Sequence, residues 1–466
     1  MRWVWNIRLS ITNSGDGQRG DCSTGTPVRL FLEPIFIKYN NKMKKQITIM
    51  LLMLACMAAA AQPVSTVVTC PGEDASQSMR ISWAAPAKGY YVKYSADDNK
   101  GNAATLKPET EFRCTTFEGV SSKAADGTDI VEQAVFVKCG ATLKNLNPNT
   151  RYSYVICDPA GNEACPEHHF VTAGAAEWQC CVISDFHAYT PLQHRQDEAM
   201  KMLETVAEYG GGVDWTLHLG DITAWGASWS FWQKLYAEPA FSRMMWAGCV
   251  GNHDYMARNY RRLSNEFFNQ ANYFPENGYR GEMGVCYHFR YGDAMFVMLN
   301  SESMRSDEGL AAAQQWVRKV VGEARRSSNA PRYVIVGEHY QWFFGNDGRT
   351  SQYERWSKVF DELGVDLALA GNNHIYVRTD AVYGGATTDG ATRGTVYVQT
   401  PSADDERGQA MKPELKHNAH LIKSRWTEGA KTVGALLMKV NRRKIALTLL
   451  DRNGKVIDTV DVMAKR

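Results

Sequence analysis

The stretch "LALAGNNHIYVR", residues 367–378, shows how this chain is built. Its first four residues are small or apolar, which is typical of a strand covered on both faces of a sheet. The run then stops at Gly371, and two asparagines and His374 follow at once. In open α/β sheets, ligands bind beyond the carboxyl ends of the strands. The stretch therefore predicts a ligand site at a strand end, and other strand ends should carry similar side chains.

Several other segments also read as buried strands, namely 178–185, 215–221, 244–254, 294–303 and 332–339. Helical periodicity joins several of them, at 196–209, 310–326 and 352–363. This alternation of strands and helices predicts an α/β layered domain. Three later segments, 394–400, 433–441 and 444–462, are expected to add antiparallel strands to that domain, the last with a hairpin turn at Asn453-Gly454.

Residues 64–174 have a different pattern, in which short segments alternate apolar and polar residues between turns rich in Gly, Asp, Asn and Pro. Three of these segments, at 79–83, 89–95 and 150–158, read as strands of an all-β sandwich. The stretch "LKNLNPNTRYSYVICD" resembles the end of a fibronectin type III domain, where a turn and a tyrosine corner precede the penultimate strand. We therefore expect a small β-sandwich domain ahead of the α/β domain.

Residues 43–61 have the layout of a secretory signal peptide: a basic start, a short apolar run and small residues before Gln62. The apolar run is too short to span a bilayer comfortably, so no transmembrane span is expected. This layout predicts export to the periplasm or the extracellular space. Residues 1–42 then read as a non-native upstream extension, with a genuine long leader as the alternative. A second alternative is a lipoprotein acylated at Cys56.

The overall charge excludes one class of partner. Lys and Arg number 52 against 50 Asp and Glu, so no strong field would draw the chain onto a nucleic acid polymer. Nine of the eleven cysteines follow residue 61, and five of these precede residue 170. Because an exported protein can form disulfides, we expect one or two in the N-terminal domain, with a connectivity that cannot be read from the sequence.

Carboxylate, imidazole and amide side chains recur at five of the predicted strand ends: Asp185, His187, Asp221, Asn252, His253, His339 and His374. Each of these side chains alone is weak evidence for a metal site, because aspartate after glycine often caps a turn and a single histidine is often part of the core. We expect His218, His168 and His169 to be such structural histidines. The recurrence of these side chains at successive strand ends favours a metal site.

The order Asp-x-His, Gly-Asp, Gly-Asn-His-Asp, His and Gly-x-x-His resembles that of the calcineurin-like metallophosphoesterase superfamily. With the β-sandwich in front, the architecture looks like the purple acid phosphatase branch. The resemblance implies a fibronectin type III-like domain at 62–174 and a metallophosphoesterase domain at 177–466. The latter would be a β-sandwich flanked by helices, in αββα layers.

Position by position, the resemblance implies two metal sites. The first would use Asp185, His187, Asp221 and His374, and the second would use Asp221, Asn252, His339 and Asn372. Two divalent ions (Mn, Fe, Zn or Mg) sharing Asp221 would generate a bridging hydroxide that attacks phosphorus. His253 would donate a hydrogen bond or a proton to the phosphate or the leaving oxygen. The implied activity is that of an acid phosphatase-like phosphoric ester hydrolase with a small phosphorylated substrate.

Two positions depart from the family pattern. Ala224 stands where purple acid phosphatases carry the tyrosine that colours them, so we expect a colourless enzyme without an Fe(III) requirement. Asn372 stands where the family usually has histidine, and an amide oxygen would shift the second site from zinc toward manganese, magnesium or calcium. The alternative is that Asn372 leaves a vacancy, so that the protein is a non-catalytic surface binding protein with one metal.

The sequence leaves more than one interpretation of the residues that would contact the substrate. Tyr340, Trp342 and Phe343 either wall a pocket for a nucleoside, as in a nucleotide phosphodiesterase or nucleotidase, or pack in the core. Arg378 and the segment 401–409 are candidates for the surroundings of the metals. His417 or His420 could supply from a loop the imidazole that position 372 lacks.

Overall fold

The computed structural model describes residues 64–123, 129–174, 177–257, 263–344, 351–409 and 418–465, without the side chains of 117–133. The predicted signal peptide at 43–61 and the predicted extension at 1–42 lie outside the described residues, as does His417. Their assignments stay predictions. No helix in the described ranges is both long and apolar enough to cross a membrane.

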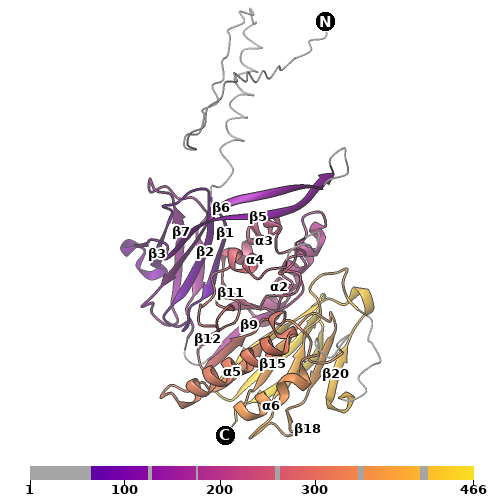
Figure 1. Ribbon diagram of the computed structural model, residues 1–466. Coiled ribbons are helices and arrows are strands. Elements are labelled where there is room, and N and C mark those ends of the chain that lie inside the picture. Colours follow the sequence, from indigo (N-terminus) through magenta and orange to yellow (C-terminus); the bar gives the residue numbers. More distant parts are fainter. Residues whose placement is uncertain are drawn as a thin grey trace, which may run out of the picture. The chain divides into compact units, whose positions relative to one another are not determined.

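The N-terminal region is the predicted all-β sandwich of two antiparallel sheets (Figure 1). One sheet has the order β4-β3-β7-β8, and the other contains β1-β2-β6-β5. The strands are β1 (Ser65–Pro71), β2 (Met79–Ala85), β3 (Tyr91–Ala96), β4 (Ala104–Leu106), β5 (Thr110–Lys123), β6 (Asp129–Leu143), β7 (Arg151–Cys157) and β8 (His168–Val171). Strands β5 and β6 form a long hairpin that the sequence patterns did not indicate.

The sheet that contains β1 does not end with the N-terminal region. Strand β1 pairs in parallel with β11, through Thr69 and Met245, so that one ten-stranded sheet runs β23-β22-β21-β9-β10-β11-β1-β2-β6-β5. Its remaining strands are β9 (Trp178–Ile183), β10 (Trp215–His218), β11 (Met245–Gly248), β21 (Gly434–Val440), β22 (Lys444–Asp451) and β23 (Val456–Met463). Residues 62–466 accordingly form one compact unit, and the predicted boundary between 174 and 177 stays a prediction.

A second sheet of seven strands has the order β12-β13-β14-β15-β19-β16-β20. Its strands are β12 (Tyr287–Tyr291), β13 (Ala294–Met298), β14 (Tyr333–Gly337), β15 (Leu367–Ala370), β16 (Tyr376–Thr379), β19 (Val396–Gln399) and β20 (Ile422–Trp426), and β17 (Val382–Tyr383) with β18 (Ala386–Thr387) forms a separate hairpin. Strand β19 pairs antiparallel with β16, as expected, but in parallel with β15 on its other side, which was not expected. The intervening strand β16 and the β17–β18 hairpin carry the chain back, so that β19 runs in the same direction as β15.

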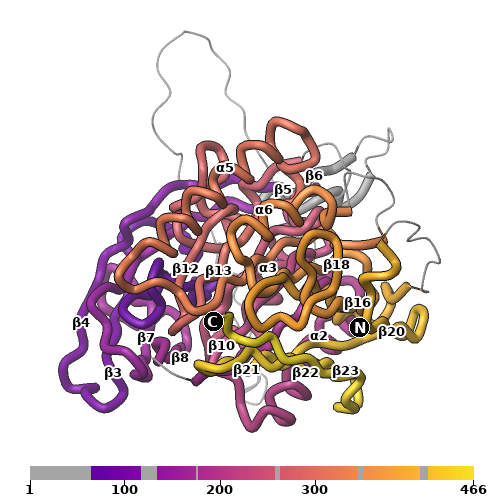
Figure 2. The backbone as a smooth tube through the Cα atoms, turned by 90° about the horizontal axis from the view of Figure 1, so that it is seen from below, coloured from indigo at the N-terminus to yellow at the C-terminus, as the bar shows by residue number. Residues whose placement is uncertain are grey.

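Helices complete the layers, as Figures 1 and 2 show. Helix α2 packs on β9 and β21, whereas α5 and α6 bury Trp316, Val317 and Trp356 against the second sheet. Helix α5 starts at Ser306, whose Oγ accepts the Gly309 N–H at 3.0 Å, a typical N-cap. The helices are α2 (Gln193–Gly210), α3 (Trp229–Tyr236), α4 (Glu266–Ala271), α5 (Asp307–Arg326) and α6 (Tyr353–Leu363).

The expected disulfides are not formed, because all nine described cysteines are free and buried. For three of the N-terminal cysteines, the strand registers explain this result. Cys70 stands opposite Arg80, Cys114 opposite Phe136, and Cys139 opposite Trp83 and Glu111. No two of these three cysteines face each other across a strand pair, so they serve as small apolar core residues.

Candidate metal centre

All eight residues predicted for the site follow the carboxyl ends of five strands. Asp185 and His187 follow β9, Asp221 follows β10, Asn252 and His253 follow β11, His339 follows β14, and Asn372 and His374 follow β15. Strands β9 to β11 belong to the first sheet, and β14 and β15 belong to the second. The site therefore lies where the two sheets present their carboxyl ends to each other.

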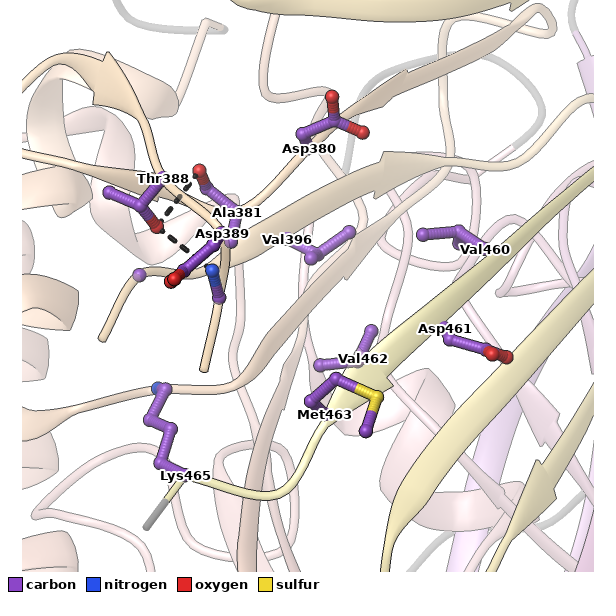
Figure 3. Close-up of a pocket in the computed structure, with 12 residues that line it drawn as sticks. Asp380, Ala381, Thr388, Asp389, Val396, Val460, Asp461, Val462, Met463 and Lys465 are labelled. Atoms are coloured by element: carbon purple, nitrogen blue, oxygen red, sulfur yellow. Dashed lines mark hydrogen bonds between the residues drawn. The ribbon is translucent and has the colours of Figure 1, made fainter. Parts of the chain in front are cut away.

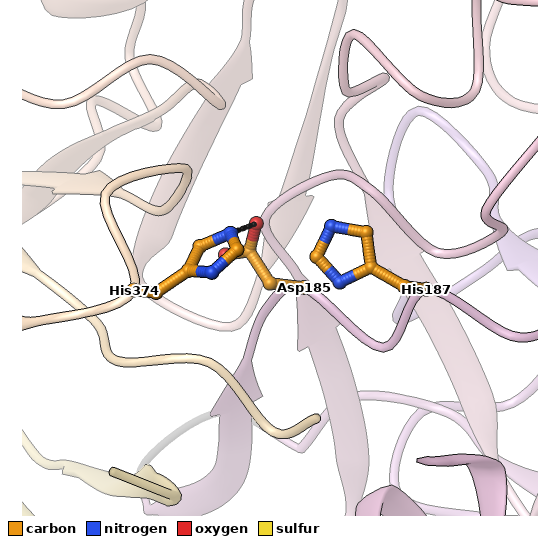
Figure 4. A group of neighbouring side chains, drawn as sticks. All are labelled: Asp185, His187 and His374. Carbon is orange, nitrogen blue, oxygen red and sulfur yellow. Dashed lines mark ion pairs between the residues drawn. The ribbon is translucent and has the colours of Figure 1, made fainter. Parts of the chain in front are cut away.

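The ligating atoms converge to within 4.8 Å in three groups, Asp185–His187–His374, His187–Asp221–His253 and Asp185–Asp221–His339. Figure 4 shows the first of these groups, with Asp185 between the rings of His187 and His374. Asp185, His187 and His339 are fully buried, and Asp221 and His374 are nearly so. Carboxylates and imidazoles that are gathered out of contact with water require a charge partner.

The backbone at this centre is held in an unusual conformation. Asp185, His187, Asp221, Asn372 and His374 all have positive φ, between 46° and 64°. Non-glycine residues adopt this region rarely and at some cost, and such strain clusters at functional sites. The loops after β9 and β10 hold each other there, because the N–H of Asp185 donates to Gly220 O at 3.0 Å and that of His187 to Asp221 O at 2.9 Å.

The histidine tautomers follow from their backbone partners. His374 Nδ1 lies 2.6 Å from Arg407 O, and His339 Nδ1 lies 2.7 Å from Leu219 O. A carbonyl oxygen only accepts, so both Nδ1 atoms carry hydrogen, and in the neutral rings both Nε2 atoms present lone pairs. Metal-binding histidines are typically oriented in this way.

Those lone pairs face other acceptors. His374 Nε2 is 3.2 Å from Asp185 Oδ1, whereas His339 Nε2 is 3.3 Å from Asp221 Oδ2 and 3.1 Å from Asn252 Oδ1. Acceptor atoms at such distances repel one another unless a proton or a metal cation lies among them. The donor set of imidazole, carboxylate and amide oxygen suits Zn, Fe, Mn or a similar divalent ion, so these residues fit the expected metals.

Asp221 occupies the centre of the arrangement. Its Oδ2 lies 3.3 Å from Nε2 of His187 and also 3.3 Å from Nε2 of His339, and its Oδ1 accepts the backbone N–H of His253 at 2.7 Å. One carboxylate therefore serves both histidine groups. This is the arrangement that the predicted bridging role of Asp221 requires.

The electrostatics of the centre favour cations. Burial opposes ionisation of Asp221, but His339 and His253 hold its pKa well below the usual value. Burial likewise opposes the protonation of His339, yet Asp221 and Asp185 raise its pKa to about 10. The two carboxylates are therefore anionic at neutral pH, and the proton on His339 is one that a metal ion would displace.

His253 lies beside this centre and is oriented by the backbone. Its Nδ1 is 2.8 Å from Ala224 O, and its ring centroid is 4.9 Å from that of His187 and 5.7 Å from that of Trp225. The Nδ1 hydrogen is thus committed to Ala224, and Nε2 is the atom available for chemistry. Burial lowers the pKa of His253.

Asn372 is held on two sides. Its backbone N–H donates to Asp185 Oδ2 at 3.1 Å, and its side-chain N–H donates to Gln341 Oε1. Because the amide nitrogen is taken by Gln341, the carbonyl Oδ1 is the side-chain atom left for a cation. The role of Asn372 as a ligand stays a prediction.

The sequence did not specify the contributions of the segment 401–409. Asp404, fully buried, has Oδ2 at 3.4 Å from His187 Nδ1, and Ser402 Oγ donates to Asp185 O at 3.0 Å. Arg407 lies beside the site, with Nη2 at 3.5 Å from His253 Nε2. The signal that could have identified these residues is the direction of β19. A parallel β19 ends at the same sheet edge as β15, and this segment follows it directly.

Other candidates lie elsewhere. Arg378 pairs with Asp458 at 2.7 Å, so it is a structural cation, and His420 Nε2 lies 3.3 Å from Gly385 O. Trp342 and Phe343 are core residues, with exposed fractions of 0% and 1%. The prediction for His218 as a buried structural histidine agrees with its environment, in which burial lowers its pKa to about 3.

A separate cavity of about 280 Å³ is lined by residues of the β17–β18 region and of β23 (Figure 3). Its lining includes Asp380, Asp389, Asp461 and Lys465 but none of the predicted metal ligands. Lys465 is already paired, with Nζ at 3.1 Å from Asp366 Oδ1. This cavity is therefore distinct from the metal centre.

Comparisons with known proteins agree with this architecture. Residues 180–376 match the family model of calcineurin-like phosphoesterases, and residues 64–172 match that of the purple acid phosphatase N-terminal domain. An uncharacterized protein of Mycobacterium tuberculosis (strain ATCC 25618 / H37Rv) is 23% identical over 194 residues. The match covers 39% of this chain and only 36% of that relative.

Two solved structures share the fold. A purple acid phosphatase from yellow lupin (Lupinus luteus) seeds superposes with a TM-score of 0.67 at 15% identity, covering 86% of this chain and 74% of the lupin chain. The structure of PhoD superposes with a TM-score of 0.52 at 14% identity, covering 87% of this chain and 93% of that one. The two family matches identify this chain as a calcineurin-like metallophosphoesterase with a purple acid phosphatase N-terminal domain, and the two solved structures share its fold.

Proposed function

We propose that this protein is an exported phosphatase that hydrolyses phosphate esters with two divalent metal ions. The position of Asp221 Oδ2, 3.3 Å from Nε2 of both His187 and His339, is the observation that supports it most strongly. A shared carboxylate is what two neighbouring cations need to offset their repulsion. Export rests on the signal-peptide layout of residues 43–61.

Each residue of the centre has a distinct task. Asp185, His187 and His374 would hold one ion, His339 and Asn252 the other, and Asp221 would lie between them, with Asn372 as the remaining expected ligand of the second ion. Two such ions, when bound, activate water and polarise the phosphoryl group. His253 holds its Nδ1 hydrogen on Ala224 O at 2.8 Å, so its Nε2 is the atom that can pass a proton to the leaving oxygen.

The nucleotide-specific alternative loses the support of two of its three aromatic residues. It depended on an aromatic wall after His339, but Trp342 donates its Nε1 hydrogen to Ala368 O at 3.0 Å, and Phe343 stacks on Tyr353 at 5.1 Å between ring centroids. Both rings are committed to the core. The non-catalytic alternative depends on Asn372 and is addressed by experiment.

The test uses the chain from Gln62 onward, which forms one compact unit. Bound metals are measured, and p-nitrophenyl phosphate and bis-p-nitrophenyl phosphate are assayed with Mn, Mg and Zn. We expect turnover by the wild type and a loss of roughly 10²- to 10⁴-fold in His253→Ala, the usual contribution of a general acid. His420→Ala, which changes a histidine outside the site, is the matched control. If wild type cleaves neither ester with any metal while Asn372→His does, the protein is a binding protein.

A further inference from the structure

Arg407 lies beside the metal centre. Its Nη2 is 3.5 Å from His253 Nε2, and its carbonyl oxygen is 2.6 Å from His374 Nδ1, which fixes the backbone at the centre. Among the described residues, no carboxylate lies within 4.0 Å of the Arg407 guanidinium. A half-buried guanidinium beside a phosphoesterase centre is placed to donate to an oxyanion bound there.

Two acidic residues on the same segment, Asp405 and Glu406, are engaged by other cations. Glu406 pairs with Arg195 at 2.6 Å and with His194 at 2.7 Å, whereas Asp405 lies 3.9 Å from Arg452. These partners lie on α2 and on the β22–β23 turn. Asp405 and Glu406 are thus neutralised away from the centre, Asp404 faces His187, and the segment's one cation lies next to His253.

We propose that Arg407 binds the phosphoryl oxygens of the substrate and favours phosphomonoesters over phosphodiesters. A guanidinium matches the spacing of phosphate oxygens and donates charge-assisted hydrogen bonds to them. A monoester carries up to two negative charges and three non-bridging oxygens, whereas a diester carries one charge and two such oxygens. An added cation at this position therefore contributes more to the binding of a monoester. This role rests on the proposed phosphatase function.

Arg407 can be changed without disturbing the scaffold, because its contact with His374 is made by the backbone carbonyl. The variants are Arg407→Gln, which removes the charge, and Arg407→Lys, which retains the charge but lacks the planar guanidinium that can donate two parallel hydrogen bonds. The matched control is Arg243→Gln, which changes an exposed arginine outside the site. Metal content, the dissociation constant for inorganic phosphate on the manganese-loaded protein, and kcat/KM for the two nitrophenyl esters are measured for each.

For Arg407→Gln we expect phosphate binding and monoester kcat/KM to weaken by roughly 10- to 100-fold, the usual effect of losing charged hydrogen bonds. Diester kcat/KM should fall several-fold less, metal content should not change, and Arg407→Lys should recover part of the loss. Phosphate affinity within twofold of wild type, equal losses on both esters, or loss of metal would overturn the proposal. A wild type that binds phosphate tightly but cleaves neither ester would overturn both the phosphatase function and the monoester preference, and would leave only phosphate binding by Arg407.

Discussion

Replacing Asp404 with asparagine tests how the centre holds His187. The Asp404 side chain is fully buried, its Oδ2 lies 3.4 Å from His187 Nδ1, and its Oδ1 accepts the Glu406 N–H at 2.8 Å. Asparagine keeps the size and the Glu406 contact but puts an amide in place of Oδ2. The carboxylate oxygen that faces His187 Nδ1 is then lost, which removes the negative charge that favours hydrogen on Nδ1 over hydrogen on Nε2. That atom lies 3.3 Å from Asp221 Oδ2, where a metal ligand must have a lone pair.

The expected magnitude follows from the position of Asp404 behind a ligand. Loss of such a partner typically weakens metal binding by roughly 10- to 100-fold. Each tenfold loss in affinity lowers the stabilisation by excess metal by about 1.4 kcal/mol. Asp404→Asn should therefore show a smaller rise in Tm on addition of Mn²⁺ than the wild type, together with a weaker Mn²⁺ dissociation constant from chelator competition.

The neighbouring residue supplies the control. Asp405 faces Arg452 and His194 rather than the centre, so Asp405→Asn should bind Mn²⁺ like the wild type. An Asp404→Asn protein whose Mn²⁺ affinity stays within threefold of wild type would refute the reasoning, because His187 would then be held without this carboxylate.

Three further predictions concern the scaffold. In Gly371→Ala the new Cβ would lie 2.1 Å from Ser184 Oγ, so we expect about 1–3 kcal/mol lower stability in denaturant unfolding. In Gly101→Ala the new Cβ has no atom within 4 Å, so the stability should hardly change. Equal losses of stability in the two variants would contradict the prediction for Gly371. Burial lowers the pKa of Lys138 from 10.5 to about 8, so between those pH values the unfolded state binds more protons and wild-type stability should rise with pH relative to Lys138→Met. At about 1.4 kcal/mol per pKa unit, the stability of the wild type should rise by ~3 kcal/mol relative to that of the variant over this pH range. A stability difference that does not change with pH would refute the prediction. Finally, alkylation of the unfolded, unreduced chain from Gln62 should label all nine cysteines, whereas two protected thiols would reveal a disulfide.

Much of the site could be predicted from the sequence because its residues follow strands with clear apolar runs. Asp185, Asp221 and His339 come directly after such runs, and parallel strands bring their ends to one edge. Asp404 and Arg407 could not be assigned in the same way, since their place depends on the direction of β19. That direction is set by the crossover through β16, which leaves no local pattern in the sequence.

The same limit applies to the fold. The N-terminal sandwich and the α/β layers were each visible in local periodicity, but the pairing of β1 with β11 joins residues far apart in the chain. The disulfides were expected from the number of cysteines and their compartment. Strand register decides whether two cysteines meet, and register is set by the packing of whole sheets.

The ten-stranded sheet contains strands of both the N-terminal sandwich and the metal centre, so the two should unfold together. Besides the β1–β11 pair, Arg80 stacks on Tyr273 at 3.6 Å, and Lys138 Nζ donates to Asn272 O at 2.9 Å. Removing the sandwich would turn β11 into an open sheet edge, ready to pair with another chain. Asn252 and His253 follow β11, so a truncated metallophosphoesterase domain would be prone to aggregate through the strand that supports part of its metal centre.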